Sequence, residues 1–417
     1  MKIFKIILSI VFITGLLTAG EKNDSLKIYT LKQNVITGTR AEVSQSNLPS
    51  TVSILSAVEI EQSGERSIAK LVGDKIPGLF LTERGVIGYG AAQGAAGGIT
   101  IRGVGGSPNT GTLILIDGRP QFMGIFGHPF PDNYLSMNTE RVEVVRGPAS
   151  VLYGTNAMGG VINIITKKND KPGFRANINS SYGTYNSVIN DVGVGYSIGG
   201  LDLYGSYNHS ETDGHRDFTK FNMNSGYGKA TFSFSEEYSV YADFNVSKFR
   251  TFDPGTVYKP LINNWMEISR GSIGFALNNN FSKFDGGIKF YYNWGTNNVY
   301  DGWYSEDKNV NLLVYQNLKI FDDNVTTVGI DYKHYGGEGK NTKSAQFSKN
   351  FIEGKNFIDE TGIYILSQQY FTNKFVLNGG LRYENNSKFG NEIVPQIGMA
   401  YHIDDNNTVK AVVSKGF

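Results

Sequence analysis

Cysteine is absent from all 417 residues of the chain. Its absence excludes a disulfide framework, a thiolate nucleophile and a lipid anchor on an N-terminal cysteine. A strong charge of one sign is also lacking, because the formal net charge is only +1. Proteins that bind nucleic acid usually present a basic face, so no such partner is expected. After the N-terminus no run of about twenty apolar residues occurs, which excludes a helical membrane protein.

Motifs of catalytic or metal chemistry are scarce as well. The five histidines lie far apart, with neither an HExxH motif nor paired ligand spacing. Gly106 and Ser107 stand without a GxSxG elbow, and no lysine follows the glycine-alanine loop 85–98 as it would in a phosphate cradle. The sequence therefore predicts no enzyme activity, no metal site and no cofactor.

The first twenty residues have the composition of a secretory signal peptide. Lys2 and Lys5 precede an apolar run, residues 6–17, and small residues follow at 18–20. The alternative is a short membrane anchor, but an apolar run of about twelve residues is too short to span a bilayer. We therefore expect residues 1–20 to be a signal peptide, cleaved near Gly20, and the mature chain to be exported.

The most informative stretch runs from Asn138 to Lys168. Its pattern predicts a strand, a turn at Gly147 and Pro148, one short helical turn and a second strand over residues 161–165. Charged residues lie inside the first strand, at positions 141, 143 and 146. Such charges are tolerated beside apolar positions only when each has a partner or water. The pattern indicates a compact αβ element with polar residues facing a wet surface.

This stretch, NTERVEVVRGPASVLYGTNAMGGVINIITKK, resembles the end of the plug domain of TonB-dependent outer-membrane receptors. The family pattern there is ERVEV-RGP-S-LYG-A-GGVINI-TK, and the runs IRG and LILIDGRP further upstream are also similar to the plug. The resemblance covers residues 32–168. It implies a plug domain seated in the lumen of a barrel, which in these transporters has 22 strands, and a place in the bacterial outer membrane.

A short extended segment near the mature N-terminus resembles the TonB box of the family, DTLVVTA-R. The family's box pairs as a β-strand with the periplasmic energy-coupling protein TonB, which is strand addition. Asn34 and Gly38 depart from the family's leucine and alanine, and the alternative is simply the first strand of the plug. The matching positions are Lys32, Gln33, Asn34, Val35, Ile36, Thr37 and Gly38.

Local patterns predict the other plug elements. Strands are expected at 51–55, 99–102 and 112–116, and a helix with one apolar face is expected to begin at Ser67 and to end at Pro77. The expected division is a mobile N-terminus with the TonB box (21–40), a plug domain (41–170) and a barrel region (171–417).

Beyond the boundary near Lys171 the pattern changes to long alternating strands. Residues 240–247 and 288–294 alternate with period two between an apolar and a polar face, as in a transmembrane barrel. A soluble β-sandwich would also alternate, but long strands joined by short turns on one side and longer loops on the other favour a barrel. The longer loops are expected at 213–220, 250–265, 296–308, 336–356 and 385–391.

The strand count is about thirteen, and bacterial single-chain barrels need an even number to close. The predicted fold is therefore a partial antiparallel membrane β-barrel, about 13 of 22 strands, with an αβ plug in its lumen, in a truncated chain. The alternative is a complete smaller barrel that ends on the terminal Phe417.

The resemblance implies active import of a scarce ligand, with TonB and outer-membrane lipid as partners. A ferric siderophore is the first expectation for the ligand, followed by haem and cobalamin. A non-transporting binding or adhesion barrel is an alternative, and a passive porin is disfavoured by the plug.

Two plug loops, 85–98 and 121–134, are expected to face outward and to meet the ligand. His128 could coordinate haem iron, although a histidine beside proline is more often a turn residue. The residues predicted to contact the ligand are Tyr89, Gln93, Phe122, Phe126 and His128.

Three charged residues match family positions that face the barrel wall. The resemblance implies that Arg141, Glu143 and Arg146 hold the plug against the barrel through charge pairs that separate in water at little cost. The alternative is that these charges only solvate a surface of the plug.

Overall fold

The structure is a computed structural model that describes residues 34–83, 85–89, 97–106, 110–169, 171–342, 354–405 and 407–417. The predicted signal peptide and three predicted site residues, Lys32, Gln33 and Gln93, lie outside the described residues. Among the described residues, no helix is both long enough and apolar enough to cross a membrane.

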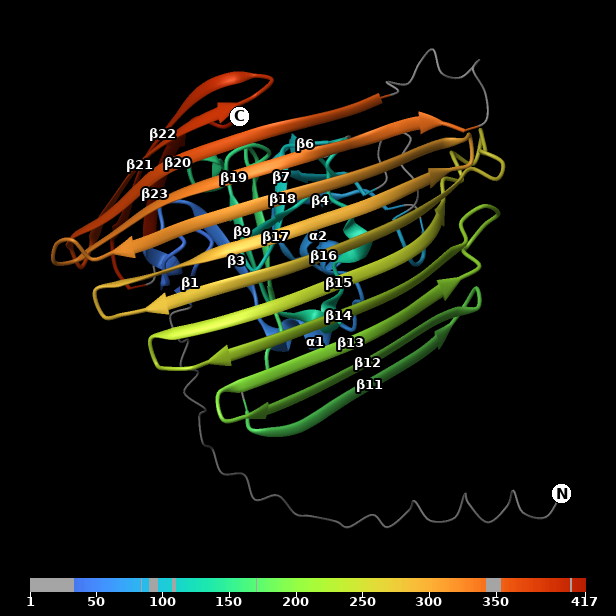
Figure 1. The fold of residues 1–417 in the computed structure, drawn as a ribbon, viewed down its shortest axis with the longest axis horizontal. Coiled ribbons are helices and arrows are strands. Elements are labelled where there is room, and N and C mark those ends of the chain that lie inside the picture. The colour runs from blue at the N-terminus through green and yellow to red at the C-terminus, as the bar shows by residue number, and fades with distance from the viewer. Residues whose placement is uncertain are drawn as a thin grey trace, which may run out of the picture. The chain divides into compact units, whose positions relative to one another are not determined.

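Within the described residues, thirteen antiparallel strands form one sheet in which each strand pairs with the next along the chain (Figure 1). This confirms the predicted strand number. The strands are β11 (Gly173–Gly183), β12 (Ser187–Ile198), β13 (Leu201–Thr212), β14 (Phe221–Ser233), β15 (Tyr238–Phe252), β16 (Trp265–Asn280), β17 (Phe284–Val299), β18 (Trp303–Leu318), β19 (Asn324–Asn341), β20 (Gly354–Thr372), β21 (Phe375–Asn386), β22 (Gly390–His402) and β23 (Thr408–Ser414).

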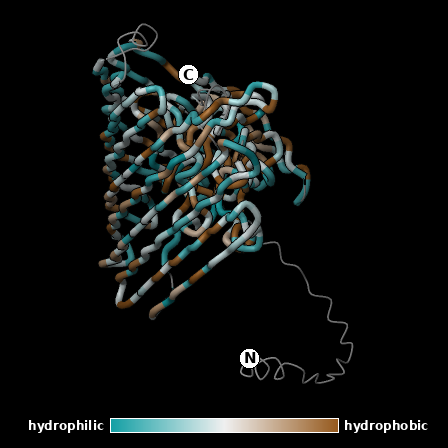
Figure 2. Tube along the Cα trace, turned by 90° about the vertical axis from the view of Figure 1, so that its right-hand side faces the viewer, coloured by the Kyte–Doolittle hydropathy of each residue, from teal (hydrophilic) through white to brown (hydrophobic). Residues whose placement is uncertain are grey.

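The two faces of this sheet differ in polarity. In β15, Phe244 and Val246 are exposed on the convex face, whereas Asp243 and Ser247 are buried on the concave face. Hydrophilic and hydrophobic residues alternate in this way along the strands (Figure 2). Because successive side chains of a strand point to opposite faces, the alternation gives one apolar surface and one polar surface.

The connections between strands agree only in part with the predicted loops. Loops are present at 213–220 and 253–264, but the loop predicted at 296–308 is wrong, because β17 and β18 continue until only residues 300–302 connect them. The polar composition of these strand ends resembles that of a loop, although the residues continue the alternation of the strands. Asn297 and Ser305 are buried, and they are hydrogen-bonded across the two strands at 3.0 Å.

The remaining two loops are also shorter than predicted. The loop predicted at 385–391 is reduced to 387–389, and the connection between β19 and β20 covers 342–353 rather than 336–356. Residues 343–353 of that connection lie outside the described residues. Strands in this sheet therefore extend several residues beyond the apolar band that the sequence pattern located.

Residues 34–169 form a plug built on a five-stranded sheet of order β3-β9-β10-β7-β8. Only the β10–β7 pair is parallel. The strands are β3 (Thr51–Leu55), β7 (Thr112–Ile116), β8 (Arg119–Gln121), β9 (Thr139–Arg146) and β10 (Gly160–Thr166); smaller sheets contain β1 (Asn34–Val35) with β2 (Val43–Ser44), and β4 (Leu79–Leu81) with β5 (Ile99–Ile101) and β6 (Val104–Gly105).

In the part of the plug that the structure describes, three α-helices and three 3-10 turns accompany the sheets. Helix α2 is the predicted one, and its apolar face is buried. Helix α1 was not predicted, although Ser56 and Glu59 form a capping box at its start, which is a sequence-level signal of a helix N-terminus. The helices are α1 (Ala57–Ser63), α2 (Ile68–Lys75) and α3 (Ser150–Tyr153), and the 3-10 turns are η1 (Gln45–Asn47), η2 (Pro131–Asn133) and η3 (Ser136–Asn138).

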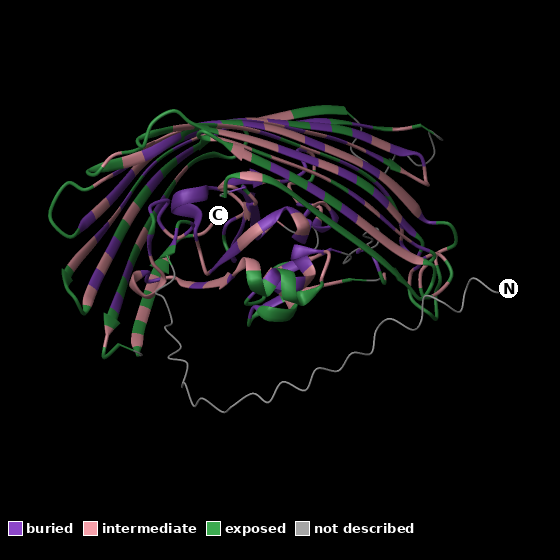
Figure 3. Cartoon of the chain, turned by 90° about the horizontal axis from the view of Figure 1, so that it is seen from below, coloured by how far each residue is buried: buried purple, intermediate pink, exposed green. Residues whose placement is uncertain are grey.

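The plug lies against the concave face of the curved thirteen-stranded sheet, which we call the wall (Figure 3). Among the described residues, two apolar clusters join the two parts. In the first, Val151 and Leu152 of α3 pack with three wall residues, which are Tyr364, Leu366 and Val394. In the second, Ile87 and Leu135 of the plug pack with four wall residues, which are Phe221, Met223, Phe249 and Ile268. Polar groups make further contacts between the plug and the wall, and these contacts are described next.

Candidate functional site

The first contact between plug and wall is the turn that joins β7 to β8. Asp117 has a φ of +48°, and its carboxylate accepts hydrogen bonds from Thr166 within the plug. Lys229 of β14 reaches the same carboxylate at 2.9 Å, and Lys289 of β17 donates to the Asp117 carbonyl at 2.8 Å. Two lysines from the wall thus hold one plug turn.

Arg119, two residues further on, completes this anchor. Its guanidinium lies 2.6 Å from the carboxylate of Asp243 in β15, and both side chains are almost fully buried. Burial would raise the pKa of Asp117, but the charges of Lys229 and Arg119 outweigh it and hold that pKa at about 2. The carboxylate is therefore ionised at any physiological pH. We call Asp117, Arg119, Lys229, Asp243 and Lys289 the turn anchor.

A second group of contacts surrounds the end of helix α3. Lys333 of β19 is buried and pairs with Glu360 of β20 at 3.2 Å. Glu360 accepts from Thr155 of the plug at 3.1 Å, and Arg382 of β21 pairs with Asp331 and Glu384. The wall therefore supplies a buried network of opposite charges to which α3 is fitted.

Elsewhere, wall side chains bond to the plug backbone. Asn317 and Thr327 donate to the carbonyls of Arg40 and Thr39. Toward another part of the plug, Asn309 donates to the Phe122 carbonyl at 2.7 Å. Such bonds do not depend on the identity of the plug side chain, so they position the plug without selecting its sequence.

The three charges predicted to hold the plug against the wall have their observed partners within the plug. Arg141 pairs with Glu143 at 2.8 Å, and Arg146 donates to the carbonyl of Pro77. Glu143 is completely buried and accepts from Thr37. The plug-wall ion pairs that the structure describes belong instead to the turn anchor: Asp117 with Lys229, and Arg119 with Asp243.

Sequence reasoning missed the turn anchor, although two signals pointed to it. Asp117 and Arg119 lie in the LILIDGRP run that resembles the plug of the family. Lys229 and Lys289 are cations on the polar, inward side of their strands, where a partner is required.

The described part of the predicted TonB box is held by the plug. Asn34 and Val35 form β1 and pair with β2. The backbone amides of Ile36 and Thr37 donate to Glu143 at 3.0 and 2.9 Å, and a side chain at Gly38 would collide with Leu48. Residues 34–35 therefore fit the alternative interpretation, in which this segment is the first strand of the plug.

Two of the four described residues predicted to bind ligand are buried. Tyr89 is 3% exposed and hydrogen-bonded to Ser67, and burial raises its pKa. Phe122 packs edge-on against Tyr335 of β19 with ring centroids 5.2 Å apart. These two side chains support the loops rather than presenting a free surface.

The other two predicted ligand residues form part of an aromatic cluster. Phe126 is 45% exposed, stacks on His128 and lies 6.5 Å from the ring of Trp303 at the start of β18. His128 in turn packs against Phe130, and the guanidinium of Arg270 lies 5.5 Å from the Phe130 ring. We call Phe126, His128, Phe130 and Trp303 the aromatic cluster.

His128 is suited to remain neutral. Burial lowers its pKa from the usual value, and its Nδ1 donates to the Pro129 carbonyl at 3.1 Å. That hydrogen bond places the unprotonated Nε2 on the other edge of the ring. Within the described residues no three histidine or acidic side chains gather in a way that could hold a metal ion.

Comparison with known proteins identifies this arrangement. A family model described as "TonB dependent receptor-like, beta-barrel" matches residues 153–417, and one described as "TonB-dependent Receptor Plug Domain" matches residues 44–161. The chain belongs to the TonB-dependent receptor family. The receptor is accordingly a protein of the bacterial outer membrane.

Curated and solved relatives agree with this assignment. The receptor is 25% identical over 397 residues to an iron-regulated outer membrane virulence protein of Vibrio cholerae, covering 89% of this chain and 57% of that protein. Its fold is similar to the siderophore receptor PirA of Pseudomonas aeruginosa (TM-score 0.66, 22% identity, 88% and 64% of the two chains covered). It is also similar to the siderophore receptor PiuA of Acinetobacter baumannii (TM-score 0.70, 15% identity, 90% and 65% covered).

The receptor chain thus spans a little more than half the length of the curated relatives that it matches. The similarity to the solved structures concerns the fold, because their identities are low. What the whole receptor carries, and with which partner, is therefore treated below as a proposal.

Proposed function

We propose that this receptor imports a ferric siderophore across the outer membrane and that TonB supplies the energy. The observation that carries the proposal is the turn anchor, in which charged wall residues hold a plug that fills the concave side of the sheet. When a plug moves, its polar and charged contacts can be exchanged for water, whereas the apolar clusters between plug and wall must expose hydrophobic surface, so the displacement needs a source of energy. A stopper held in this way can be displaced and can return.

The names of the relatives support iron as the cargo. The curated relative is an iron-regulated outer membrane virulence protein, and several of the structural neighbours are siderophore receptors. The exposed ring of Phe126 is a suitable surface for a chelate with aromatic groups, and the buried ring of Trp303 supports it.

Residues Lys32 to Gly38 are proposed as the segment that pairs with TonB. Strand addition needs free backbone amides and carbonyls, whereas the amides of Ile36 and Thr37 are occupied by Glu143. Pairing over the whole segment therefore requires these two bonds to open, and pairing over its first residues does not.

The test is iron-limited growth of a strain that lacks its own siderophore receptors and expresses the complete receptor. Ferric enterobactin, ferric pyoverdine and haem are supplied singly, with the wild type and with a deletion of residues 32–38. Growth on a ferric siderophore that requires both the receptor and the box is expected. Growth that persists after the deletion would contradict coupling through the box and would favour a passive or non-transporting barrel.

Haem is the second candidate cargo, favoured by the orientation of His128. A neutral imidazole with an available Nε2 is the usual axial ligand of haem iron. Under this alternative, His128→Ala abolishes growth on haem and changes the absorption spectrum of the receptor mixed with haem. If His128→Ala affects neither, the residue acts only in packing the loop.

A further inference from the structure

Every polar atom of Thr37 is bonded to the core of the plug. Its amide and hydroxyl donate to Glu143 at 2.9 and 2.6 Å, its hydroxyl accepts from Asn163 at 2.9 Å, and its carbonyl accepts from the Tyr153 hydroxyl at 3.0 Å. The residue is 1% exposed. A bond to a buried carboxylate is stronger than one between neutral groups. Thr37 is therefore a firmly held point near the beginning of the plug.

The bonds of Thr37 lead into the centre of the plug sheet and on to the wall. Glu143 and Asn163 are directly paired across β9 and β10. Asn163 also accepts from the amide of Gly118 at 3.0 Å. Gly118 adjoins Asp117, which Lys229 and Lys289 hold from the wall. A continuous series of hydrogen bonds thus links the N-terminal segment to the turn anchor.

On the N-terminal side of Thr37, the described chain is held by the burial of Val35, which is 0% exposed in an apolar cluster, and by a small number of hydrogen bonds, including one from Asn34 to Glu42. Sheet β1–β2 has only two pairs of residues, Asn34 with Ser44 and Val35 with Val43, and Ile36 adds one amide bond to Glu143. A pull on the N-terminus would separate these contacts first and would then act on Thr37.

We propose that Thr37 is the junction through which tension on the N-terminal segment enters the plug, and that Asn163 passes it to the turn anchor. This inference rests on the proposed function, because it assumes that a partner pulls on the segment. If the inference holds, the hydroxyl of Thr37 transmits the pull to the turn anchor, which must open when the plug moves. Without the hydroxyl, the segment is extracted while the turn anchor stays closed.

Thr37→Val is the decisive variant, since valine keeps the shape and the backbone amide but removes two of the four polar contacts. Thr37→Ser retains the hydroxyl and serves as the conservative rescue. Thr139→Val is the matched control, because Thr139 is also buried in the plug and its hydroxyl donates to the Leu135 carbonyl. Thr139 takes no part in the series of bonds from Thr37 to the wall.

The first experiment pulls the complete receptor by its N-terminus while it is embedded in lipid vesicles. In Thr37→Val, the force of the first major rupture should fall to roughly half, because half of the contacts of Thr37 are lost. Thr37→Ser and Thr139→Val should keep the wild-type force. Equal forces in Thr37→Val and wild type, or an equal loss in Thr139→Val, would overturn the inference whether or not the receptor imports iron.

The second experiment measures uptake of radiolabelled ferric enterobactin or ferric pyoverdine, whichever supports growth of the wild type. Thr37→Val should bind the chelate with unchanged affinity. Its uptake should be slower by at least about tenfold, because Thr37→Val removes two buried hydrogen bonds, and Thr37→Ser should restore it. Uptake by Thr37→Val at the wild-type rate would overturn the inference. Absence of uptake by the wild type would instead contradict the proposed function.

Discussion

Gly154 illustrates at the residue scale how closely the plug is fitted to the wall. Its φ of +75° lies in the region that favours glycine. A Cβ atom placed there would lie 3.0 Å from a nitrogen of Arg382 and 3.1 Å from the Lys333 ammonium. Both cations are buried and ion-paired, so neither can move aside without losing its partner. The residue must therefore be small for two independent reasons.

Gly154→Ala is expected to loosen the plug through both effects. Backbone strain of this kind costs about 1–3 kcal/mol, and displacement of Arg382 or Lys333 adds to it. The measurement is the urea concentration at which the plug becomes sensitive to protease. Gly103→Ala is the matched control, because Gly103 has a φ of +79° and open space around it. If both variants lower this urea concentration equally, the contact of residue 154 with Arg382 and Lys333 does not contribute to the stability of the plug.

Asp132 should make the stability of the plug depend on pH. Burial raises its pKa to about 6, although Arg66, 3.8 Å away, opposes the rise. The folded plug therefore binds the proton more tightly than the unfolded chain does. The stabilisation is complete below the unfolded pKa of about 3.9 and is lost as the pH rises through 6. The difference between the folded pKa of about 6 and the unfolded pKa of about 3.9 corresponds to roughly 3 kcal/mol of folding free energy.

Protease resistance of the plug in urea, measured at pH 4.5 and pH 7.5, tests this dependence. The wild-type plug should lose stability between the two values, and Asp132→Asn should lose less, because an amide does not titrate. An identical change in both proteins would mean that other groups control the dependence.

At the scale of elements, patterns with a regular period were predicted well. Strands β3 and β7 have the predicted bounds, and α2 buries the predicted apolar face. Elements without a regular spacing of apolar residues were predicted less well. Helix α1 was not predicted, and β17 and β18 are longer than predicted at the ends that face each other across residues 300–302. Polar residues there belong to strands because they pair across the sheet, and such pairing is a tertiary property that local sequence does not express.

The candidate site was less predictable than the fold for a related reason. Phe126 and His128 were correctly placed in one loop, yet their packing with Trp303 joins residues far apart in the chain. For Arg141 and Glu143, the family resemblance identified the charged positions but not their partners. Partners of buried charges depend on the register of strands, so they become visible only in three dimensions.

The β7–β8 turn is expected to be the strongest polar attachment of the plug. Arg119→Met would leave Asp243 buried without its cation, which costs about 3–5 kcal/mol. The double variant Arg119→Met with Asp243→Leu removes both charges and should recover most of that loss. The measurement is the thermal unfolding, in detergent, of the complete wild-type receptor, of Arg119→Met and of the double variant. A double variant as unstable as Arg119→Met would show that the pair stabilises by packing rather than by charge.

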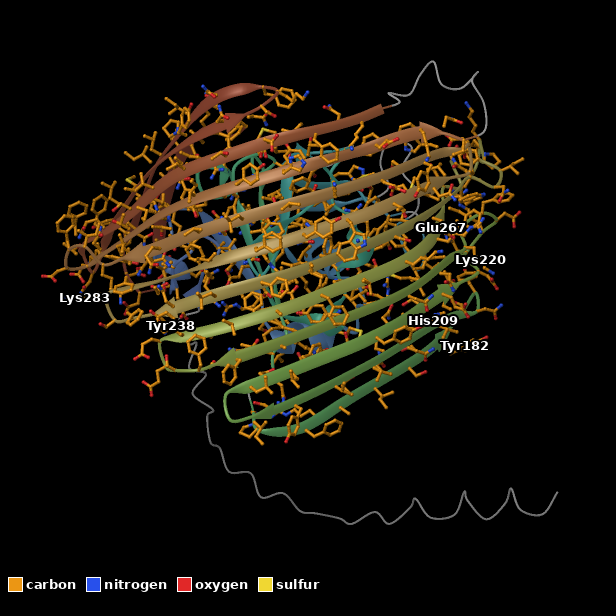
Figure 4. All side chains as sticks on the ribbon, in the orientation of Figure 1. Tyr182, His209, Lys220, Tyr238, Glu267 and Lys283 are labelled. Atoms are coloured by element: carbon orange, nitrogen blue, oxygen red, sulfur yellow. The ribbon has the colours of Figure 1, made fainter. Side chains whose placement is uncertain are left out.

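At the scale of the whole molecule, the wall must face two different solvents. Its concave face offers lysines, asparagines and carboxylates to the plug, while the convex face presents Phe275, Ile288 and Ile363. Polar side chains gather toward the strand ends: Figure 4 shows His209, Lys220 and Glu267 toward one end and Lys283 at the other, beside Tyr238. This distribution matches a lipid-facing apolar band between two polar margins.

A charge placed in the middle of that band should therefore be far more damaging than one at its margin. Ile363 lies in the middle of β20, is 55% exposed and pairs with Ile330 of β19. Ile363→Arg is expected to destabilise folding into lipid vesicles by about 2–4 kcal/mol, whereas Asn298→Arg near the end of β17 should cost about 0–1 kcal/mol. Equilibrium folding in urea with vesicles measures both. Equal costs would mean that the convex face near Ile363 does not contact lipid, because water or a further protein surface would solvate the arginine.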